Sequence, residues 1–154
     1  MAVKEIAYDA DGWGKGTIWL DDDVLVWHEL PRPADGAAAE NGHPLADRLR
    51  RYFAGERVTF DDIAIDLDWC TDFQRDVAET LRAVPYGEVV TYGELAALAG
   101  YPNAQRAAGT FCAHNRLPLV LPCHRVVAAS GLGSYGSLGQ GFKRRLLELE
   151  GIRL

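Results

Sequence analysis

The 154-residue sequence predicts two subdomains in series. Residues 1–68 are expected to form an α/β unit with a small antiparallel sheet and one helix, and residues 69–154 a mainly α unit with a helix-turn-helix. Three observations predict this fold class: short apolar runs separated by turn residues come first, helical spacing dominates the rest, and the composition changes near residues 66–71. Apolar residues make up 48% and charged residues 25%, so a packed core is expected rather than disorder.

The first apolar runs, at residues 3–8, 16–20 and 24–28, predict β-strands. Segments containing Asp and Gly separate them at residues 9–12 and 21–23, and these residue types favour tight turns. Strands joined by such short turns pair in the antiparallel sense. The beginning of the chain therefore predicts a small antiparallel sheet.

A loop, a helix and a further strand are expected before the subdomain boundary. Residues 31–42 are rich in Pro, Ala, Gly and Asn, which favours a loop. Residues 44–54 place apolar side chains at every fourth position, as one face of a helix does, and Gly55 is expected to end this helix. Residues 58–65 predict another strand.

Two capping boxes mark the starts of helices in the second subdomain. Thr71 with Gln74 is expected to open a helix with one apolar stripe, and Thr91 with Glu94 a second helix that runs through Leu98. In such a box each side chain hydrogen-bonds the backbone amide of the other residue, so the helix start is defined locally.

A further helix is expected over residues 104–113, with Asn103 as its N-cap. Two short helices joined by a tight turn are typical of a helix-turn-helix, and an ordinary αα-hairpin is the alternative. A last helix is expected over residues 142–151, beginning with the basic residues 143–145.

The helix expected over residues 104–113 has an unusual surface for a DNA reader. A major-groove reader displays several long polar side chains, whereas this helix has the single Arg106. Around this arginine it carries the small residues Ala104, Ala107, Ala108 and Gly109. A bare helix with one arginine favours close approach to a backbone or a narrow groove.

The charge is unevenly distributed along the chain. The total is −6, but residues 101–154 hold seven basic and two acidic residues, a net +5, and residues 1–100 carry −11. A basic C-terminal part can present a positive face to phosphates. A solvated acidic half with a chance basic excess explains the same numbers, so charge alone does not decide between them.

The sequence carries no pattern that predicts export or membrane insertion. Its N-terminal residues lack the basic-then-apolar layout of a signal peptide, and no apolar run is long enough to span a bilayer. A cytoplasmic protein with no membrane partner is therefore expected.

The reactive residue predicted by the sequence is Cys123. In a cytoplasmic chain the three cysteines, Cys70, Cys112 and Cys123, are expected as reduced thiols. Cys123 is followed by His124 and Arg125, and a base or positive charge beside a thiol favours the nucleophilic thiolate.

Two other readings of this segment stay open. Cys123 is equally consistent with a small buried core residue, and adjacent residues on a strand point to opposite faces. Cooperation with His124 therefore requires an irregular backbone, which Pro122 favours. A metal site from Cys112, His114 and the 123–124 pair does not match common zinc spacings.

Several separated motifs resemble the O6-alkylguanine-DNA alkyltransferases, also called methylated-DNA–protein-cysteine methyltransferases. The resemblance covers residues 71–151 and is centred on the Pro-Cys-His-Arg-Val sequence at 122–126. Its other motifs lie at residues 73–75, 85–87, 91–93, 106–109 and 146–151, with Asn115 between them. The N-terminal half resembles the small α/β domain of the family in outline.

The resemblance implies irreversible transfer of the alkyl group to Cys123, once per molecule, with no cofactor and no metal. His124 would take the thiol proton through a water molecule, and Glu150 would hold and polarise His124, as in other nucleophile–base–acid triads. Tyr92 would protonate the leaving guanine. Asn115 would brace the turn before the active-site segment.

The implied partner is double-stranded DNA with an alkylated guanine, bound by a monomer through the minor groove. Arg106 would fill the gap left by the extruded nucleotide, and Tyr92 would press on the neighbouring phosphate. The other expected DNA contacts are Thr91, Ala107, Gly109 and Arg125, with Lys143, Arg144 and Arg145 at phosphates.

The implied substrate pocket is formed by Val126, Cys112, Tyr135, Gly136 and Ser137. Main-chain carbonyls of Cys123 and Val126 and an amide near Gly136 would recognise the guanine edges. Cys112 falls where the family lines the alkyl pocket.

The chain departs from the family pattern after the recognition helix. The family usually has Asn-Pro there, whereas this chain has Asn115 followed by Arg116. The loss of proline frees the backbone φ angle, and Arg116 adds a candidate phosphate contact.

Two other functions compete with alkyl transfer. A non-catalytic module that binds and flags alkylated bases would use the same DNA face, but retention of Cys123 argues against it. A transcription regulator would read sequence through the helix-turn-helix, but one arginine offers little base readout.

Overall fold

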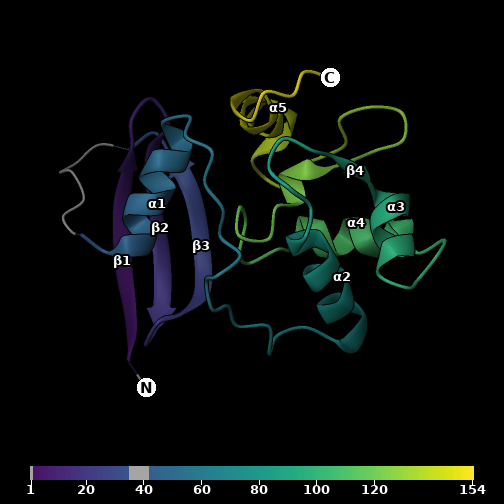
Figure 1. The fold of residues 1–154 in the computed structure, drawn as a ribbon, viewed down its shortest axis with the longest axis horizontal. Coiled ribbons are helices and arrows are strands. Elements are labelled where there is room, and N and C mark those ends of the chain that lie inside the picture. The colour runs from purple at the N-terminus through teal and green to yellow at the C-terminus, as the bar shows by residue number, and fades with distance from the viewer. Residues whose placement is uncertain (1, 35–41) are drawn as a thin grey trace. The chain divides into compact units, whose positions relative to one another are not determined.

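The computed structural model describes residues 2–34 and 42–154. Contacts divide the chain into two compact units, residues 1–66 and 67–154, and each is described by itself (Figure 1). The loop expected at 31–42 lies largely outside the described residues. Among the residues described, no helix is both long and apolar enough to cross a membrane.

The N-terminal unit is built on a three-stranded antiparallel sheet in the order β1-β2-β3. The strands span Val3–Ala10, Gly14–Asp21 and Val24–Arg32, and β1 pairs with β2 from Val3↔Asp21 to Ala10↔Gly14. The predicted sheet is confirmed, and its strands are longer than their apolar runs because the tight turns allow pairing to start next to them.

Helix α1, Pro44–Phe53, packs on the sheet (Figure 1). His43 caps it, with Nδ1 accepting a hydrogen bond from the backbone amide of Leu45 at 3.1 Å. Its buried face and the inward side chains of the strands form one core. Gly16 is needed in that core because a Cβ there would meet the Tyr8 ring at 2.4 Å.

The strand predicted over residues 58–65 is wrong. A turn interrupts the segment, with the backbone amide of Ile63 donating to the carbonyl of Phe60, and Arg48 holds the turn through Asp62. Pairing with the sheet is confined to an isolated bridge between Ile65 and Leu25. Val58, Ile63 and Ile65 are partly buried, but the turn prevents a continuous ladder.

The C-terminal unit begins with the helices expected from the two capping boxes. Helix α2 spans Asp72–Arg82 and α3 spans Tyr92–Leu98, preceded by the short strand β4, Val90–Thr91. Both boxes have the reciprocal hydrogen bonds between side chain and backbone that the sequence predicted. Helix α4, Gln105–Ala113, packs against α3 and completes the predicted helix-turn-helix.

The expected N-cap of α4 is wrong by one residue. Ala104 is the N-cap and makes no side-chain capping bond, whereas Asn103 has a φ of 71°. An N-cap side chain requires extended backbone, but Asn103 takes the left-handed conformation that the tight turn needs.

The segment that carries Cys123 joins the helix-turn-helix to the last helix. The apolar run at 117–121 is buried except for the partly buried Pro118, and it leads into a 3-10 turn, η1, at Cys123–Arg125, followed by strand β5, Val126–Val127. Strand β5 pairs in parallel with β4, with Thr91 opposite Val127. Because α3 starts directly after β4, this pairing brings the start of α3 to the segment that carries Cys123. Helix α5, Gly139–Leu149, closes the fold and starts three residues earlier than expected.

Candidate active site

Cys123 lies on the irregular backbone that cooperation with His124 requires. It opens the turn η1, and its amide donates to the carbonyl of Leu121 at 2.8 Å. The residue is 4% exposed, so a substrate must be brought into the protein to reach its sulfur.

Asn115 ties the end of α4 to the Cys123 thiol. Its Nδ2 donates to the carbonyl of Leu121 at 2.8 Å and to the sulfur of Cys123 at 3.2 Å, and its Oδ1 accepts from the amide of Leu117 at 2.9 Å. These bonds hold the turn in shape and direct one N–H group at the sulfur, which favours the thiolate over the thiol.

His124 and Glu150 form a buried pair behind Cys123. Nε2 of His124 is 2.6 Å from a Glu150 oxygen, and neither side chain is exposed. Burial lowers the pKa of His124, which keeps the imidazole neutral. Burial raises the pKa of Glu150, but the hydrogen bonds from His124 and Arg125 and the positive charge of Arg125 outweigh it and hold that pKa well below its ordinary value. The carboxylate can only accept, so Nε2–H donates and Nδ1 is the nitrogen that can take a proton.

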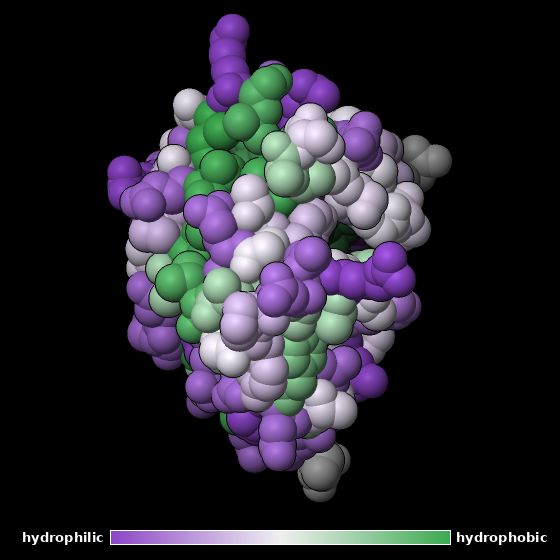
Figure 2. Space-filling view, turned by 90° about the vertical axis from the view of Figure 1, so that its right-hand side faces the viewer, coloured by the Kyte–Doolittle hydropathy of each residue, from purple (hydrophilic) through white to green (hydrophobic). Residues whose placement is uncertain are grey.

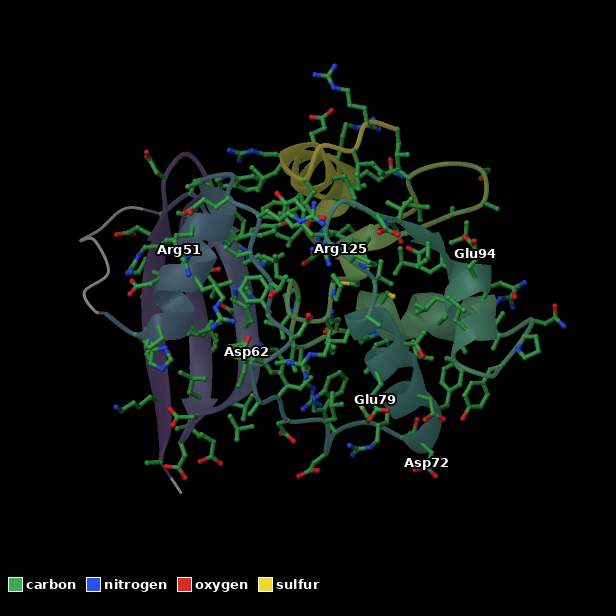
Figure 3. All side chains as sticks on the ribbon, viewed as in Figure 1. Arg51, Asp62, Asp72, Glu79, Glu94 and Arg125 are labelled. Atoms are coloured by element: carbon green, nitrogen blue, oxygen red, sulfur yellow. The ribbon has the colours of Figure 1, made fainter. Side chains whose placement is uncertain are left out.

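Arg125 has a different position from the phosphate contact that the sequence analysis expected. It is 7% exposed, with Nε and Nη2 donating to Glu150 at 2.9 and 3.1 Å and Nη1 donating to the carbonyl of Val84 at 2.8 Å. Figure 3 shows it among the elements of the C-terminal unit, whereas Asp72 and Glu94 lie at the periphery. A buried carboxylate needs such a cation, so Arg125 serves Glu150 rather than DNA.

Lys143 is a site residue that the sequence analysis misplaced on the surface. It is fully buried, with Nζ 3.1 Å from the carbonyl of Ser134 and 3.4 Å from the hydroxyl of Tyr92. A signal was present in the sequence: positions 143, 146 and 147 are spaced to share one helix face, and the last two are leucines. The run of basic neighbours at 144 and 145 obscured it.

Gly133 allows Tyr92 and Lys143 to lie side by side. Its φ of +80° suits glycine, and a Cβ there would meet the Tyr92 hydroxyl at 3.1 Å and Nζ of Lys143 at 3.2 Å. Burial and the nearby thiols Cys112 and Cys123 raise the pKa of Tyr92 to about 12. The phenol therefore stays protonated and can act as a proton donor.

Opposing effects act on the pKa of the Cys123 thiol. Burial raises its pKa, while the hydrogen bond from Asn115, the charge of Lys143 and the Tyr135 hydroxyl act in the opposite direction. The net pKa lies above the ordinary value. The thiol is thus protonated at rest, and a base has to remove its proton during reaction.

Cys112, on α4, interacts electrostatically with Cys123 and Lys143. Burial raises its pKa, a negative charge on Cys123 would raise it further, and Lys143 lowers it. Its thiol is therefore a neutral group in this part of the unit. Among the residues described, no group of three or more His, Cys, Asp or Glu side chains is placed to hold a metal ion.

The residues expected to line the substrate pocket differ in exposure. Val126 is buried in β5, and Tyr135 is nearly buried with its ring stacked on Phe142 at 6.3 Å. Gly136 and Ser137 are exposed in the loop before α5. Their expected contacts with guanine stay predictions.

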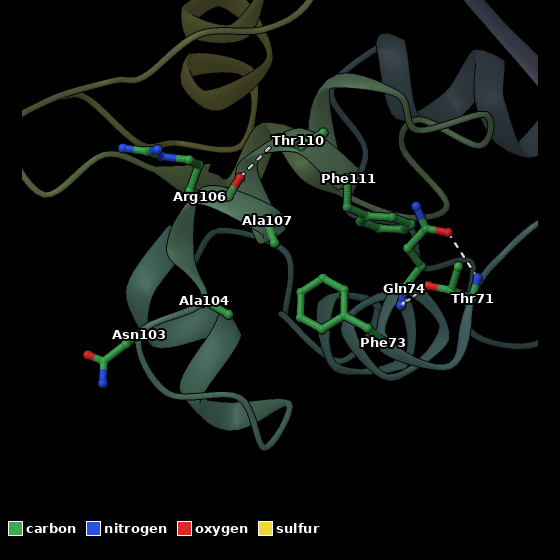
Figure 4. A pocket seen from close by; sticks show the side chains of 9 residues that line it. All are labelled: Thr71, Phe73, Gln74, Asn103, Ala104, Arg106, Ala107, Thr110 and Phe111. Carbon is green, nitrogen blue, oxygen red and sulfur yellow. Dashed lines mark hydrogen bonds between the residues drawn. The ribbon is translucent and has the colours of Figure 1, made fainter.

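Helix α4 forms a ridge between two hollows. One, of about 560 Å³, lies between α2 and α4, and the other, of about 760 Å³, lies beside the start of α3 and includes Thr91 and Tyr92. Arg106 lines both. Figure 4 shows Phe73 and Phe111 reaching toward one another in the first hollow while Arg106 extends away from them.

The surface of α4 next to Arg106 is formed largely by small residues, with Gln105 also exposed at its start. Ala107 and Arg106 are exposed, and Gly109 lies against the Tyr92 ring, where a Cβ would be 3.7 Å from Cδ1. Figure 2 views the side of Figure 1 on which α3 and α4 lie, and it shows apolar surface bordered by polar side chains. This surface permits close approach to another molecule along the ridge.

Comparison with known proteins shows which family this chain resembles. The family described as "6-O-methylguanine DNA methyltransferase, DNA binding domain" matches residues 72–152. A methylated-DNA–protein-cysteine methyltransferase of Methanopyrus kandleri is 43% identical over 127 residues, covering 80% of this chain and 94% of that protein. A protein of the same name from Mycobacterium bovis is 49% identical over 108 residues, covering 70% of this chain and 64% of that protein.

Solved structures with a similar fold carry names of the same kind as these sequence relatives. The crystal structure of the Mycobacterium tuberculosis O6-methylguanine methyltransferase superposes with a TM-score of 0.81 at 36% identity, covering 97% of this chain and 93% of that one. A structure of the protein from the same organism in complex with DNA gives a TM-score of 0.81 at 37% identity, covering 96% and 92%. These relatives are methyltransferases by name.

Proposed function

The chain belongs to the O6-methylguanine DNA methyltransferase family, and we propose that Cys123 is the residue that accepts the alkyl group from O6-alkylguanine in DNA. The observation that carries this proposal is the setting of the Cys123 sulfur. Asn115 donates to it from one side, the neutral base His124 follows it in the same turn, and Glu150 backs that base. A buried thiol with a donor and a base is equipped for nucleophilic attack.

The reaction forms one bond and breaks one. The sulfur attacks the alkyl carbon, an S–C bond forms, and the bond between that carbon and O6 breaks with its electrons left on guanine. His124 takes the thiol proton through a bridging water molecule, and the imidazolium that forms is stabilised by Glu150. The thioether on Cys123 is not hydrolysed under mild conditions, so each molecule acts once.

Tyr92 supplies the proton that the leaving guanine needs. Its raised pKa keeps the phenol protonated until negative charge develops on the base. Lys143, with Nζ 3.4 Å from the Tyr92 hydroxyl, stabilises the phenolate that remains. The active site therefore pairs a base for the nucleophile with an acid for the leaving group.

The ridge of α4 is proposed as the DNA-binding element. The small side chains of α4 next to Arg106 allow the helix to approach a minor groove closely. The hollows on its two sides offer room for the two DNA backbones. Arg106 lines both hollows and would occupy the space of the extruded nucleotide. The exposed cations Arg144, Arg145 and Arg153 would contact phosphates, so binding weakens as salt rises.

A stoichiometric assay tests the proposed acceptor. Duplex DNA with one O6-methylguanine is incubated in molar excess over the protein, and the remaining lesion is measured by nucleoside analysis. Loss of the lesion is expected at one methyl group per protein molecule, and none with Cys123→Ser. Cys70→Ser, which removes a thiol outside the site, is the matched control and retains full transfer; transfer by Cys123→Ser would contradict the assignment.

A second variant tests the acid. Tyr92→Phe removes the proton donor but keeps the ring, so single-turnover transfer is expected to slow about 10²-fold or more. Affinity for unmodified duplex DNA, measured by fluorescence anisotropy, is expected to change little. An unchanged transfer rate would exclude Tyr92 as the donor.

A further inference from the structure

An aromatic–cation stack lies beside the active-site turn and takes no part in the reaction described above. The Arg116 guanidinium lies over the Trp69 ring, with Cζ 4.9 Å from the ring centroid. Trp69 in turn stacks on Phe111, with centroids 5.8 Å apart and planes inclined by 5°. The stack joins the segment before α2, the last turn of α4 and the segment after α4.

Arg116 directly follows Asn115, the residue whose amide reaches the Cys123 sulfur. The family resemblance leads one to expect proline at this position, and a proline would fix φ near −65°. Arginine leaves that angle free. The backbone hydrogen bond at the end of α4 is also long: the amide nitrogen of Asn115 is 3.4 Å from the carbonyl oxygen of Cys112.

The direction in which the side-chain amide of Asn115 points depends on the backbone at residues 115 and 116. Nδ2 has to meet both the carbonyl of Leu121 and the sulfur of Cys123, at 2.8 and 3.2 Å. A small rotation of the chain at residue 115 moves Nδ2 and therefore changes both bonds, including the one that reaches the sulfur. Whatever fixes residue 116 therefore affects the thiol.

We propose that Arg116, stacked on Trp69, is a positioning residue for Cys123: it fixes the backbone from which Asn115 donates to the thiol sulfur, in place of the family's proline. Phe111 anchors Trp69 to α4, and the same helix leads into Asn115, so the stack closes a ring of contacts around the turn. The inference rests on the proposed role of Cys123, but the thiol's own reactivity tests it without DNA.

The expected effect follows from the strength of one contact. An exposed cation–π contact corresponds to about a two- to fivefold change in an equilibrium. Loss of the stack weakens the hydrogen bond that favours the thiolate, so the apparent pKa of Cys123 rises and its alkylation at neutral pH slows by a similar factor.

The test measures iodoacetamide alkylation of the full chain from pH 6 to 10, with the peptide that contains Cys123 quantified by mass spectrometry. Arg116→Ala and Trp69→Leu are expected to slow alkylation at neutral pH and to move its pH midpoint upward. Trp69→Phe keeps an aromatic platform and retains most of the reactivity. Arg51→Ala, which removes an exposed arginine from α1, is the matched control and leaves the profile unchanged.

Two comparisons separate positioning from charge and from general loosening. Arg116→Lys keeps the charge but not the flat stacking group, so a profile close to that of Arg116→Ala is expected; a profile identical to the unmodified chain would overturn the proposal. In an Arg116→Pro background, Trp69→Leu is expected to lose its effect on the midpoint.

An equal effect of Trp69→Leu in both backgrounds would overturn the proposal, as would an unchanged midpoint in Arg116→Ala. Thermal unfolding of each variant shows that the folded chain is being compared. Methyl transfer from DNA is measured alongside: if it fails in the unmodified chain while the alkylation profile shifts as expected, the proposed function is wrong and the positioning role stands.

Discussion

Two buried histidines, one in each unit, have different hydrogen-bond partners, and we propose a structural role for one and a chemical role for the other. His28 is 3% exposed and lies 2.6 Å from the hydroxyl of Tyr8. His124 is fully buried and lies 2.6 Å from a carboxylate oxygen of Glu150. Burial and hydrogen-bond length are nearly equal, so the partner makes the difference.

The hydrogen-bond partner determines whether a negative charge lies beside the histidine. Burial raises the pKa of Tyr8 well above its ordinary value, so the phenol stays neutral and the pair with His28 satisfies two polar groups in a core. Glu150 stays ionised because Arg125 and His124 surround it. A buried anion beside a neutral imidazole favours proton uptake by that imidazole during a reaction.

The largest effect is expected when the reactive histidine is removed. His124→Gln eliminates the base that takes the thiol proton, and the single-turnover rate of methyl transfer is expected to fall about 10²- to 10⁴-fold. His28→Gln, the matched change in the other unit, is expected to leave that rate unchanged in the folded protein. Equal losses in the two variants would break the comparison.

Removing the charge of the carboxylate is expected to destabilise the fold. Glu150→Gln leaves Arg125 buried without its anion, which lowers the free energy of unfolding by about 3–5 kcal/mol. Urea denaturation of the variant and the unmodified chain measures the difference. A loss below that of an ordinary surface substitution would mean that the Glu150–Arg125 pair contributes little.

A smaller effect is expected from the neutral pair. Tyr8→Phe leaves the His28 ring without its phenol partner in the core, at about 1–3 kcal/mol of unfolding free energy by the same measurement. Methyl transfer is expected at the unmodified rate. A slower transfer would show that the neutral pair also supports the chemistry.

The smallest effect concerns pH. The pKa of His124 is lowered by burial, so the unfolded chain binds its proton first, and the stability due to the neutral imidazole is full above about pH 6.5 and lost as pH falls below it. About 1 kcal/mol is expected over the first pH unit. Glu150, whose pKa is also lowered, adds a further loss below its ordinary value of 4.5.

Urea denaturation at pH 7.0, 5.5 and 4.0 checks this order of events. The change between the first two values is expected to shrink in His124→Gln, which has no titrating ring there. A chain that becomes more stable on acidification over this range would contradict the assigned direction of the pKa of His124.

The sequence predicted the elements whose boundaries are set locally. Capping boxes at Thr71 and Thr91 and the turn residues of the sheet act within a few positions, so α2, α3 and the hairpins were predicted correctly. The strand over 58–65 failed because a tertiary contact from Arg48 stabilises a turn that local propensity does not reveal. Asn103 failed because the turn needed a left-handed residue more than the helix needed a cap.

The predicted side chains were placed less completely than the elements. His124 and Glu150 are brought together as the family resemblance implied, whereas the contact of Asn115 with the Cys123 sulfur was not predicted. Lys143 was assigned to the surface because it lies in a basic run, although its helical spacing favours the buried face.

Arg125 was likewise expected at a phosphate. Cations are rarely buried, and a sequence does not show the anion that makes burial possible. The Glu150 carboxylate, 25 residues further along the chain, is that anion.

Peptide mass spectrometry after reaction with O6-methylguanine DNA tests the central claim most directly. The unmodified protein is expected to gain the mass of one methyl group, located on the peptide that contains Cys123. A methyl group on the peptide of Cys112, or no gain in mass, would contradict the assignment of Cys123 as the acceptor.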